Sequence, residues 1–164
     1  IDLSLGGDSG NDLIRVIREQ FPKVAMVVLS MHDERVYAER SIRAGARGYI
    51  MKRESTKKVV DAIRQVLQGN VYLSKELTEL FAQKFISGGT GGDASPISQL
   101  SDRELEVFRF IGQGYETREI AETLQVNIKT VQTYCTRIKD KLNLSSGAEL
   151  LREAIRWNDT SLVR

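Results

Sequence analysis

The sequence predicts two segments of different fold class: an α/β segment built on a parallel sheet, followed by an all-helical segment. In the first half, short runs of Val, Ile and Leu alternate with longer amphipathic stretches, which is typical of a parallel sheet covered on both faces. In the second half, apolar residues recur at helical spacing. Between them, residues 87–96 read SGGTGGDASP, and their glycines predict a flexible tether. We expect three parts, at residues 1–70, 71–95 and 96–158.

Composition limits the classes of protein to which the chain can belong. Its 164 residues are 41% hydrophobic, which is enough to bury the cores of one or two domains. No apolar run approaches the ~20 residues of a membrane span, and the start has no basic region, so neither a membrane partner nor export is expected. The one cysteine, Cys135, cannot form an internal disulfide, which fits a reducing, cytoplasmic location.

The elements expected in the α/β segment alternate along the chain. They are a strand end at 1–5, a helix at 10–21, a strand at 24–30, a helix at 33–45, a strand at 48–51 and a helix at 55–69. The first helix is expected to turn Leu13, Val16 and Ile17 toward the core. A further amphipathic helix at 74–85 is expected to lie between the two domains.

Three side chains suited to phosphoryl chemistry lie where the strands end: Asp2, Ser30 and Lys52. A carboxylate can accept a phosphoryl group, and a hydroxyl and an ammonium can hold its oxygens. Together with the loop after Asp2 and with Tyr49, they resemble the receiver domain of response regulators. The resemblance implies a doubly wound, flavodoxin-like sheet. It also implies Asp2 as phosphoacceptor and metal ligand, and Ser30, Tyr49 and Lys52 as the phosphate switch.

A complete receiver has further strands before its phosphoacceptor and an acidic pair that helps to bind Mg²⁺. This sequence lacks those residues, so we expect a partial receiver whose central strands expose their apolar faces. We expect Mg²⁺ only in the intact receiver and no cofactor in this chain. The resemblance also implies a partner, a sensor histidine kinase that phosphorylates the intact receiver.

Four helices are expected in the second segment. They lie in Leu100–Gly114, Glu116–Val126, Val126–Leu144 and residues 145–157. Ser101 and Glu104 stand at the spacing of a capping box, and Thr117 and Asn127 are the expected caps of the next two helices. Where the second and third stretches meet, only three or four residues are expected to lie outside a helix. Two helices joined by so short a turn predict a helix-turn-helix.

The third helix has two different faces. Its buried stripe is expected to be Val131, Cys135, Ile138 and Leu142, with Tyr134 at its edge. Its opposite face is expected to be Lys129, Gln132, Thr133, Thr136 and Asp140, with Arg137 close by. Gln and Thr can hydrogen-bond to base edges, and Lys and Arg can meet phosphates. The whole chain has a net charge of +2, whereas the residues 127–144 alone carry four cations and one acid. On this face alone, an ordinary solvated helix of a bundle is an equally good interpretation.

The run from Leu100 to Leu151 resembles the LuxR-type DNA-binding domain of FixJ/NarL response regulators. The matches are LSDRELEVFRFIGQG, REIAETL, and KTVQTY with IKDKLNL, in the order and spacing of the family. The resemblance implies a homodimer on double-stranded DNA, with Leu151 and Ile155 of the last helix as candidate dimer contacts. The candidates for base edges are Gln132, Thr133 and Thr136, and those for phosphates are Thr117, Arg118, Lys129, Arg137 and Lys141.

The sequence thus predicts a DNA-binding response regulator that controls transcription after aspartyl phosphorylation of the intact receiver, and not an enzyme. One alternative is a module that has lost DNA binding and keeps only dimerisation. The family often has Lys where this chain has Gln132, which would fit such a loss. It also often has His where this chain has Tyr134. A second alternative is a receiver that acts as a small phosphatase, but the missing acidic pair argues against it.

Overall fold

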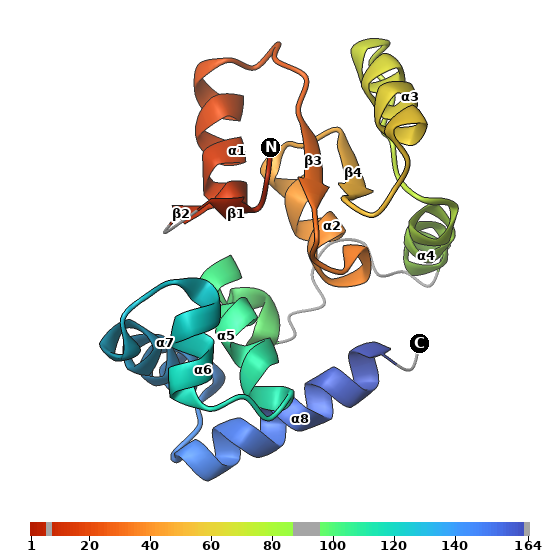
Figure 1. Ribbon diagram of the computed structural model, residues 1–164. Coiled ribbons are helices and arrows are strands. Elements are labelled where there is room, and N and C mark those ends of the chain that lie inside the picture. Colours follow the sequence, from red (N-terminus) through yellow and green to blue (C-terminus); the bar gives the residue numbers. More distant parts are fainter. Residues whose placement is uncertain (6–7, 87–95, 163–164) are drawn as a thin grey trace. The chain divides into compact units, whose positions relative to one another are not determined.

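The computed structural model describes residues 1–5, 8–86 and 96–162, which fall into two compact units, Ile1–Thr90 and Gly91–Arg164 (Figure 1). Apart from Pro96, the predicted tether lies outside the described residues. The proposed boundaries at residues 70 and 95 therefore stay predictions. Within the described ranges, none of the helices combines the length and the apolar character that crossing a membrane requires.

The first unit alternates strands and helices as the sequence predicts. Its elements are β1 (Ser4–Leu5), β2 (Asp8–Ser9), α1 (Gly10–Gln20), β3 (Val27–Ser30), α2 (Glu34–Ala44), β4 (Gly48–Met51), α3 (Thr56–Leu67) and α4 (Lys75–Ile86). β3 and β4 are parallel neighbours, with Val27 opposite Gly48 and Ser30 opposite Met51. α2 packs against β4, and α3 packs against both strands. The predicted α/β class with a parallel sheet is confirmed.

The start of the chain differs from the expected strand end. The Ile1 backbone nitrogen donates to the Val27 carbonyl oxygen at 2.7 Å, and the Leu29 amide donates to the Ile1 carbonyl oxygen at 2.8 Å. Ile1 therefore lies beside β3, but the first assigned strand, β1, pairs antiparallel with β2 instead. On the other side, Gly48 of β4 forms a parallel bridge with Tyr72. Backbone pairing thus runs from Ile1 through β3 and β4 to Tyr72.

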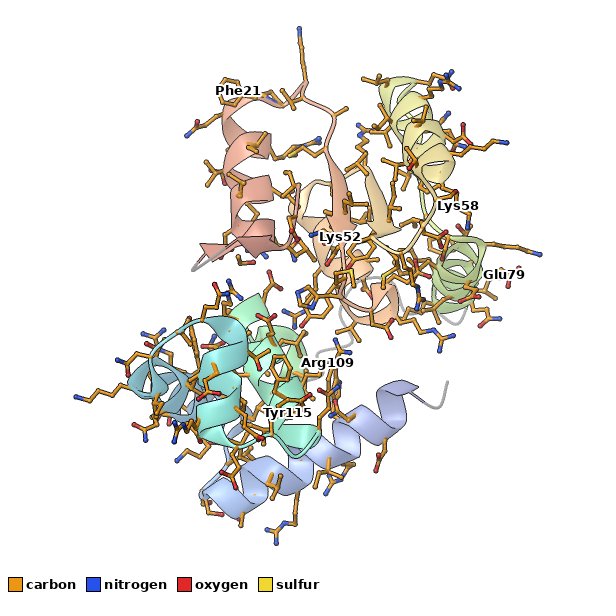
Figure 2. All side chains as sticks on the ribbon, in the orientation of Figure 1. Phe21, Lys52, Lys58, Glu79, Arg109 and Tyr115 are labelled. Atoms are coloured by element: carbon orange, nitrogen blue, oxygen red, sulfur yellow. The ribbon has the colours of Figure 1, made fainter. Side chains whose placement is uncertain are left out.

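Among the residues of this unit whose burial is described, the large exposed apolar side chains lie on helices and loops, so the expectation of exposed strand faces is wrong for β4 and met only in part for β3. Every residue of β4 is buried, and β3 alternates buried and half-buried positions. β4 is covered because α2 and α3 both pack directly against it, and α3 also packs against β3. The large apolar side chains that remain exposed here include Leu13, Val16, Phe21, Val24, Val60, Ile63 and Leu67. Figure 2 labels Phe21 at the end of α1.

α1 also turns a different face inward from the one expected. Asn11 and Ile14 are fully buried and Ile17 is half-buried, whereas Leu13 and Val16 are exposed. The cause is a close approach of backbone at Gly10, where a Cβ atom would lie 2.6 Å from the Asp2 carbonyl oxygen. Gly10 must therefore face the start of the chain, which fixes the rotation of the helix. No described residue hydrogen-bonds to the buried amide group of Asn11.

Polar contacts tie α4 to α2 at both ends of α4. The Ser74 hydroxyl donates to Glu34 at 2.8 Å and accepts from the Leu77 amide at 3.1 Å. Near the other end, the Lys84 ammonium lies 2.7 Å from the Glu39 carboxylate. Burial raises the pKa of Glu39, but its hydrogen bonds outweigh burial and leave the pKa below its ordinary value. The helix expected between the domains is therefore held on the first unit.

All the regular elements in the described part of the second unit are helices, as predicted. It consists of a short 3-10 helix that was not predicted, η1 (Pro96–Gln99), and of α5 (Asp102–Gly112), α6 (Thr117–Leu124), α7 (Ile128–Leu142) and α8 (Gly147–Leu162). α5 packs against both α7 and α8. The core gathers apolar side chains from all four α-helices, among them Leu105, Phe108, Ile120, Val131, Ile138, Leu150 and Ala154.

α5 and α8 meet closely at Gly112. A Cβ atom there would lie 2.4 Å from the Ala154 carbonyl oxygen, so only glycine fits without a shift of backbone. The buried Asn158 of α8 donates its side-chain amide to the Arg109 carbonyl oxygen at 3.0 Å. The same carbonyl oxygen accepts from the Gln113 amide at 3.0 Å, so α8 adds a second hydrogen bond to the last turn of α5 and closes the core on that side.

Candidate functional site

A three-residue turn joins α6 to α7, as a helix-turn-helix requires. Gln125 ends α6 in the left-handed conformation, at φ 54° and ψ 42°. The Asn127 side chain accepts from the Lys129 amide at 2.9 Å, which confirms the predicted cap of α7. The predicted cap of α6 is wrong by one residue. Glu116 takes that position because its amide donates to the Glu119 carboxylate at 2.7 Å, and Thr117 is the first residue of the helix.

α7 lies with its apolar stripe inside and its polar face in solvent. Val131 and Ile138 are fully buried, and Cys135 and Leu142 are half-buried. Burial raises the pKa of the Cys135 thiol, which fits a packing role rather than that of a nucleophile. The residues of the opposite face are exposed: Lys129, Gln132, Thr133, Thr136, Arg137 and Asp140. The predicted orientation of this helix is confirmed.

Both threonines on this face donate their hydroxyl protons to the helix itself. The Thr133 hydroxyl donates to the Lys129 carbonyl oxygen at 2.9 Å. The Thr136 hydroxyl donates in the same way to the Gln132 carbonyl oxygen at 3.1 Å. Toward solvent they therefore present hydroxyl lone pairs and methyl groups.

Lys141, a candidate for phosphate contact, already has a carboxylate partner. Its ammonium lies 2.6 Å from the Glu104 carboxylate and 3.2 Å from the Gln99 carbonyl oxygen. The same carboxylate oxygen accepts from the Ser101 amide at 2.7 Å, and the Ser101 hydroxyl accepts from the Glu104 amide, so the predicted capping box is confirmed. The ion pair joins the end of α7 to the start of α5.

Glu104 is charged although it is buried. Its side chain is 3% exposed, whereas that of Lys141 is 37% exposed. Burial raises the pKa of Glu104, but the hydrogen bonds from Lys141 and Ser101 outweigh it, so the pKa lies below its ordinary value. The carboxylate thus serves the cap of one helix and an ion pair with another.

In the first unit, the three predicted strand-end residues lie at one edge of the sheet. The Lys52 ammonium is 2.5 Å from the Asp2 carboxylate, and the Lys52 amide donates to the Ser30 carbonyl oxygen at 2.8 Å. Figure 2 shows Lys52 just beyond the ends of β3 and β4. An acid, an ammonium and a buried hydroxyl therefore share this edge.

Tyr49 joins this cluster through the backbone of His32. The Tyr49 hydroxyl donates to the His32 carbonyl oxygen at 2.9 Å, and the His32 amide donates to the Ser30 hydroxyl at 3.0 Å. The rings of His32 and Tyr37 are also 4.8 Å apart, a contact that the sequence does not predict. His32 thus connects the buried Ser30 with the buried Tyr49.

The described residues do not fit a magnesium site. No group of three or more His, Cys, Asp or Glu side chains that could hold a metal ion occurs among them. Asp2 contributes one carboxylate, and its partner at 2.5 Å is an ammonium rather than a second acid. A Mg²⁺ site needs several oxygen ligands, so that role for Asp2 stays a prediction for the intact receiver.

α8 turns two large apolar side chains toward solvent. Leu151 and Ile155 are each 42% exposed, whereas Leu150 and Ala154 on the adjoining face are buried in the core. These are the two residues that the sequence offers as dimer contacts. Their exposure is compatible with that role.

Two family profiles and a set of relatives match the chain. The "Response regulator receiver domain" profile covers residues 1–64, and "Bacterial regulatory proteins, luxR family" covers residues 98–154. "Oxygen regulatory protein NreC" of Staphylococcus carnosus is 38% identical over 161 residues, covering 95% of this chain and 74% of the relative. NreC of Staphylococcus epidermidis is 36% identical over the same shares of each chain.

Among solved structures, RcsB of Salmonella enterica serovar Typhimurium, bound to promoter rprA, is 27% identical. The match covers 92% of this chain and 71% of that one, at a TM-score of 0.44. The profiles and the NreC relatives decide the assignment, because both profiles and most of the relatives' length are matched. The chain belongs to the LuxR-type response regulators of two-component systems, non-enzymatic DNA-binding proteins, and carries a partial receiver and a luxR-family helix-turn-helix.

Proposed function

We propose that this chain binds promoter DNA as a homodimer, with the polar face of α7 in the major groove. The supporting observation is the exposure of Gln132, Thr133 and Thr136, while Val131 and Ile138 of the same helix are buried. A helix whose inner face is fully used and whose outer face carries short hydrogen-bonding side chains suits base readout. Because its proposed partner is chromosomal DNA, we propose that the protein acts in the cytoplasm.

Phosphate contacts in this proposal come from exposed cations around the reading face. Lys129 and Arg137 are exposed, and neither forms an ion pair within the described part of the chain. Arg118, next to Thr117 at the start of α6, pairs with Glu122, and both side chains are largely exposed. Such a pair contributes little in water, so a phosphate can replace the carboxylate. Because Lys141 is committed to Glu104, we assign it the role of fixing the end of α7.

In this proposal, DNA binding is controlled by phosphorylation of the intact receiver. We propose that a sensor histidine kinase phosphorylates Asp2, next to which Lys52 already lies. The Ser30 hydroxyl, which accepts from the His32 amide, still has its own proton to donate to a phosphoryl oxygen. A shift of Ser30 would be passed through His32 to the Tyr49 hydroxyl. Mg²⁺, held by residues of the intact receiver together with Asp2, would neutralise charge at this site.

Salt-dependent binding to promoter fragments tests the DNA-binding proposal. We expect affinity to fall steeply between low and physiological salt, and Lys129→Ala and Arg137→Ala each to reduce the slope of log K against log salt by about one. Lys75→Ala is the matched control, because this lysine is 91% exposed and lies on α4 of the first unit. A chain that forms dimers but shows no salt-dependent binding to any DNA would instead be the dimerisation module.

A further inference from the structure

We infer that Thr133 and Thr136 make the reading helix selective for A·T pairs, with thymine methyl groups as part of what is read. The inference deepens the proposed function and rests on it. It follows from where the two hydroxyl protons go, and it concerns the base composition of the site that the protein binds.

The first step concerns protons. A threonine hydroxyl has one proton, and those of Thr133 and Thr136 are donated to the carbonyl oxygens four residues earlier, at 2.9 and 3.1 Å. Both side chains are exposed. What each offers to a groove is therefore a hydroxyl oxygen that can accept and a methyl group that can make apolar contact. Neither can donate unless it first breaks its bond to the helix.

The accepting hydroxyl oxygen and the methyl group of each threonine match some base pairs better than others. Guanine presents only acceptors in the major groove, at N7 and O6, and these would face the lone pairs of the threonine oxygen. An A·T pair presents the adenine amino group, which can donate to that oxygen, and the thymine methyl group, which can pack against the threonine methyl. A C·G pair has an amino group but no methyl group. Of the four pairs, those of A and T match both features.

The third step concerns spacing. Thr133 and Thr136 are three residues apart, so they are neighbours on the helix surface, about 4.5 Å apart along its axis. On the recognition helices of zinc fingers, side chains about three positions apart contact successive bases, so we expect the two threonines to face adjacent base pairs. Gln132, whose carbonyl oxygen holds the proton of Thr136, can pair with adenine through N6 and N7. Three neighbouring side chains therefore favour the same pairs.

Selection of sites from random DNA with the full chain provides the first test. We expect each half-site to contain at least two adjacent A·T pairs, and we expect replacement of a contacted thymine by uracil, which removes only the methyl group, to weaken binding. The loss should be about fourfold, as for the burial of one methyl group. Guanine at either position should weaken binding further.

Paired variants then separate the two features. Thr136→Ser keeps the hydroxyl and loses the methyl, so it should bind thymine and uracil sites equally, whereas Thr136→Val should keep the sensitivity to uracil. Thr133 should behave in the same way at the adjacent pair. Thr123→Ser is the matched control, because the exposed Thr123 of α6 donates its hydroxyl to the Glu119 carbonyl oxygen at 2.8 Å. It should leave the sensitivity to uracil unchanged.

The outcomes distinguish this inference from the proposed function. Tight, salt-dependent binding to sites with G·C at these positions would overturn the inference and leave the proposed function standing. Equal sensitivity to uracil in the wild-type chain and in both serine variants would do the same. Absence of salt-dependent binding to any DNA would overturn both.

Discussion

Replacing Glu104 by Gln should destabilise the second unit by about 2 kcal/mol. Removing one partner of a fully buried ion pair costs about 3–5 kcal/mol, and a hydrogen bond to a charged group contributes about 1.5–3 kcal/mol. The lower range applies here because Lys141 is 37% exposed and can return to water. Gln also keeps an oxygen for the Ser101 amide, which Glu104 now accepts at 2.7 Å. In a unit of this size, the change corresponds to a fall in Tm of about 10 °C.

Tryptophan fluorescence isolates this effect in the full chain. Trp157 is the only tryptophan, and its ring lies 5.8 Å from that of Phe108 in the core of the second unit. Urea unfolding followed by this signal therefore reports on that unit. Glu122→Gln is the control, because its pair with Arg118 is exposed and should contribute at most about 0.5 kcal/mol.

The pH dependence gives a second measurement of the same contact. Because the pKa of Glu104 is below its ordinary value in the folded chain, its contribution is present above the ordinary glutamate pKa and is lost as pH falls through the folded pKa. Glu104→Gln should therefore reduce the loss of stability on acidification. Lys141→Met leaves the buried Glu104 carboxylate without its cation. Its loss of stability relative to the wild type should therefore be larger at neutral pH than in acid, where Glu104 is protonated. Equal urea midpoints and equal pH profiles for wild type and Glu104→Gln would refute the reasoning.

Three further substitutions follow from the packing. Gly112→Ala should lower Tm, at a cost of at least about 1–3 kcal/mol, because its Cβ would meet backbone of α8, whereas Gly147→Ala, with open space around it, should change stability by less than about 1 kcal/mol. Ile155→Asp should shift the chain from dimer to monomer in sedimentation at concentrations where the wild type is dimeric, because it places a charge in the apolar contact proposed for α8. Lys84→Ala should lower the hydrogen-exchange protection factors of the α4 amides. Acid pH should lower them in the wild type too, after correction for the intrinsic pH dependence of exchange, because protonation of Glu39 removes its charge from the contact with Lys84.

The second unit could be predicted well because its signals are local. The cap at Asn127, the capping box at Ser101 and the helical spacing of Val131 and Ile138 each depend on residues a few positions apart. The contact of Lys141 with Glu104 could not be predicted, because it joins residues 37 positions apart. The sequence showed a capping carboxylate and a surface lysine, but not that one is the partner of the other.

The first unit shows the opposite limit. Counting apolar residues predicts that Leu13 and Val16 face inward, yet the structure buries Asn11 and Ile14. The spacing of apolar residues takes only side chains into account, whereas the rotation of α1 is fixed by a backbone contact at Gly10. The strand-end cluster could be anticipated because the carboxyl ends of parallel strands meet at one edge, and the contact of Asp2 with Lys52 follows from that topology. The link from Ser30 through His32 to Tyr49 could not, because it uses backbone groups of a loop.

The number of cations on the second unit that remain for phosphate contact sets the salt dependence of DNA binding. Of the cations that are candidates for phosphate contact, Lys141 is paired with Glu104, which leaves Arg118, Lys129 and Arg137 on each protomer. Six such contacts in a dimer predict a slope of log K against log salt of about −5. A slope of this size indicates modest nonspecific affinity from phosphate contacts. Because phosphate contacts do not depend on sequence, the preference for an operator must come mainly from contacts with base edges. A slope near −5 that stays unchanged in Lys141→Met, with the loss confined to stability, would match this division; a shallower slope in that variant would show Lys141 on a phosphate.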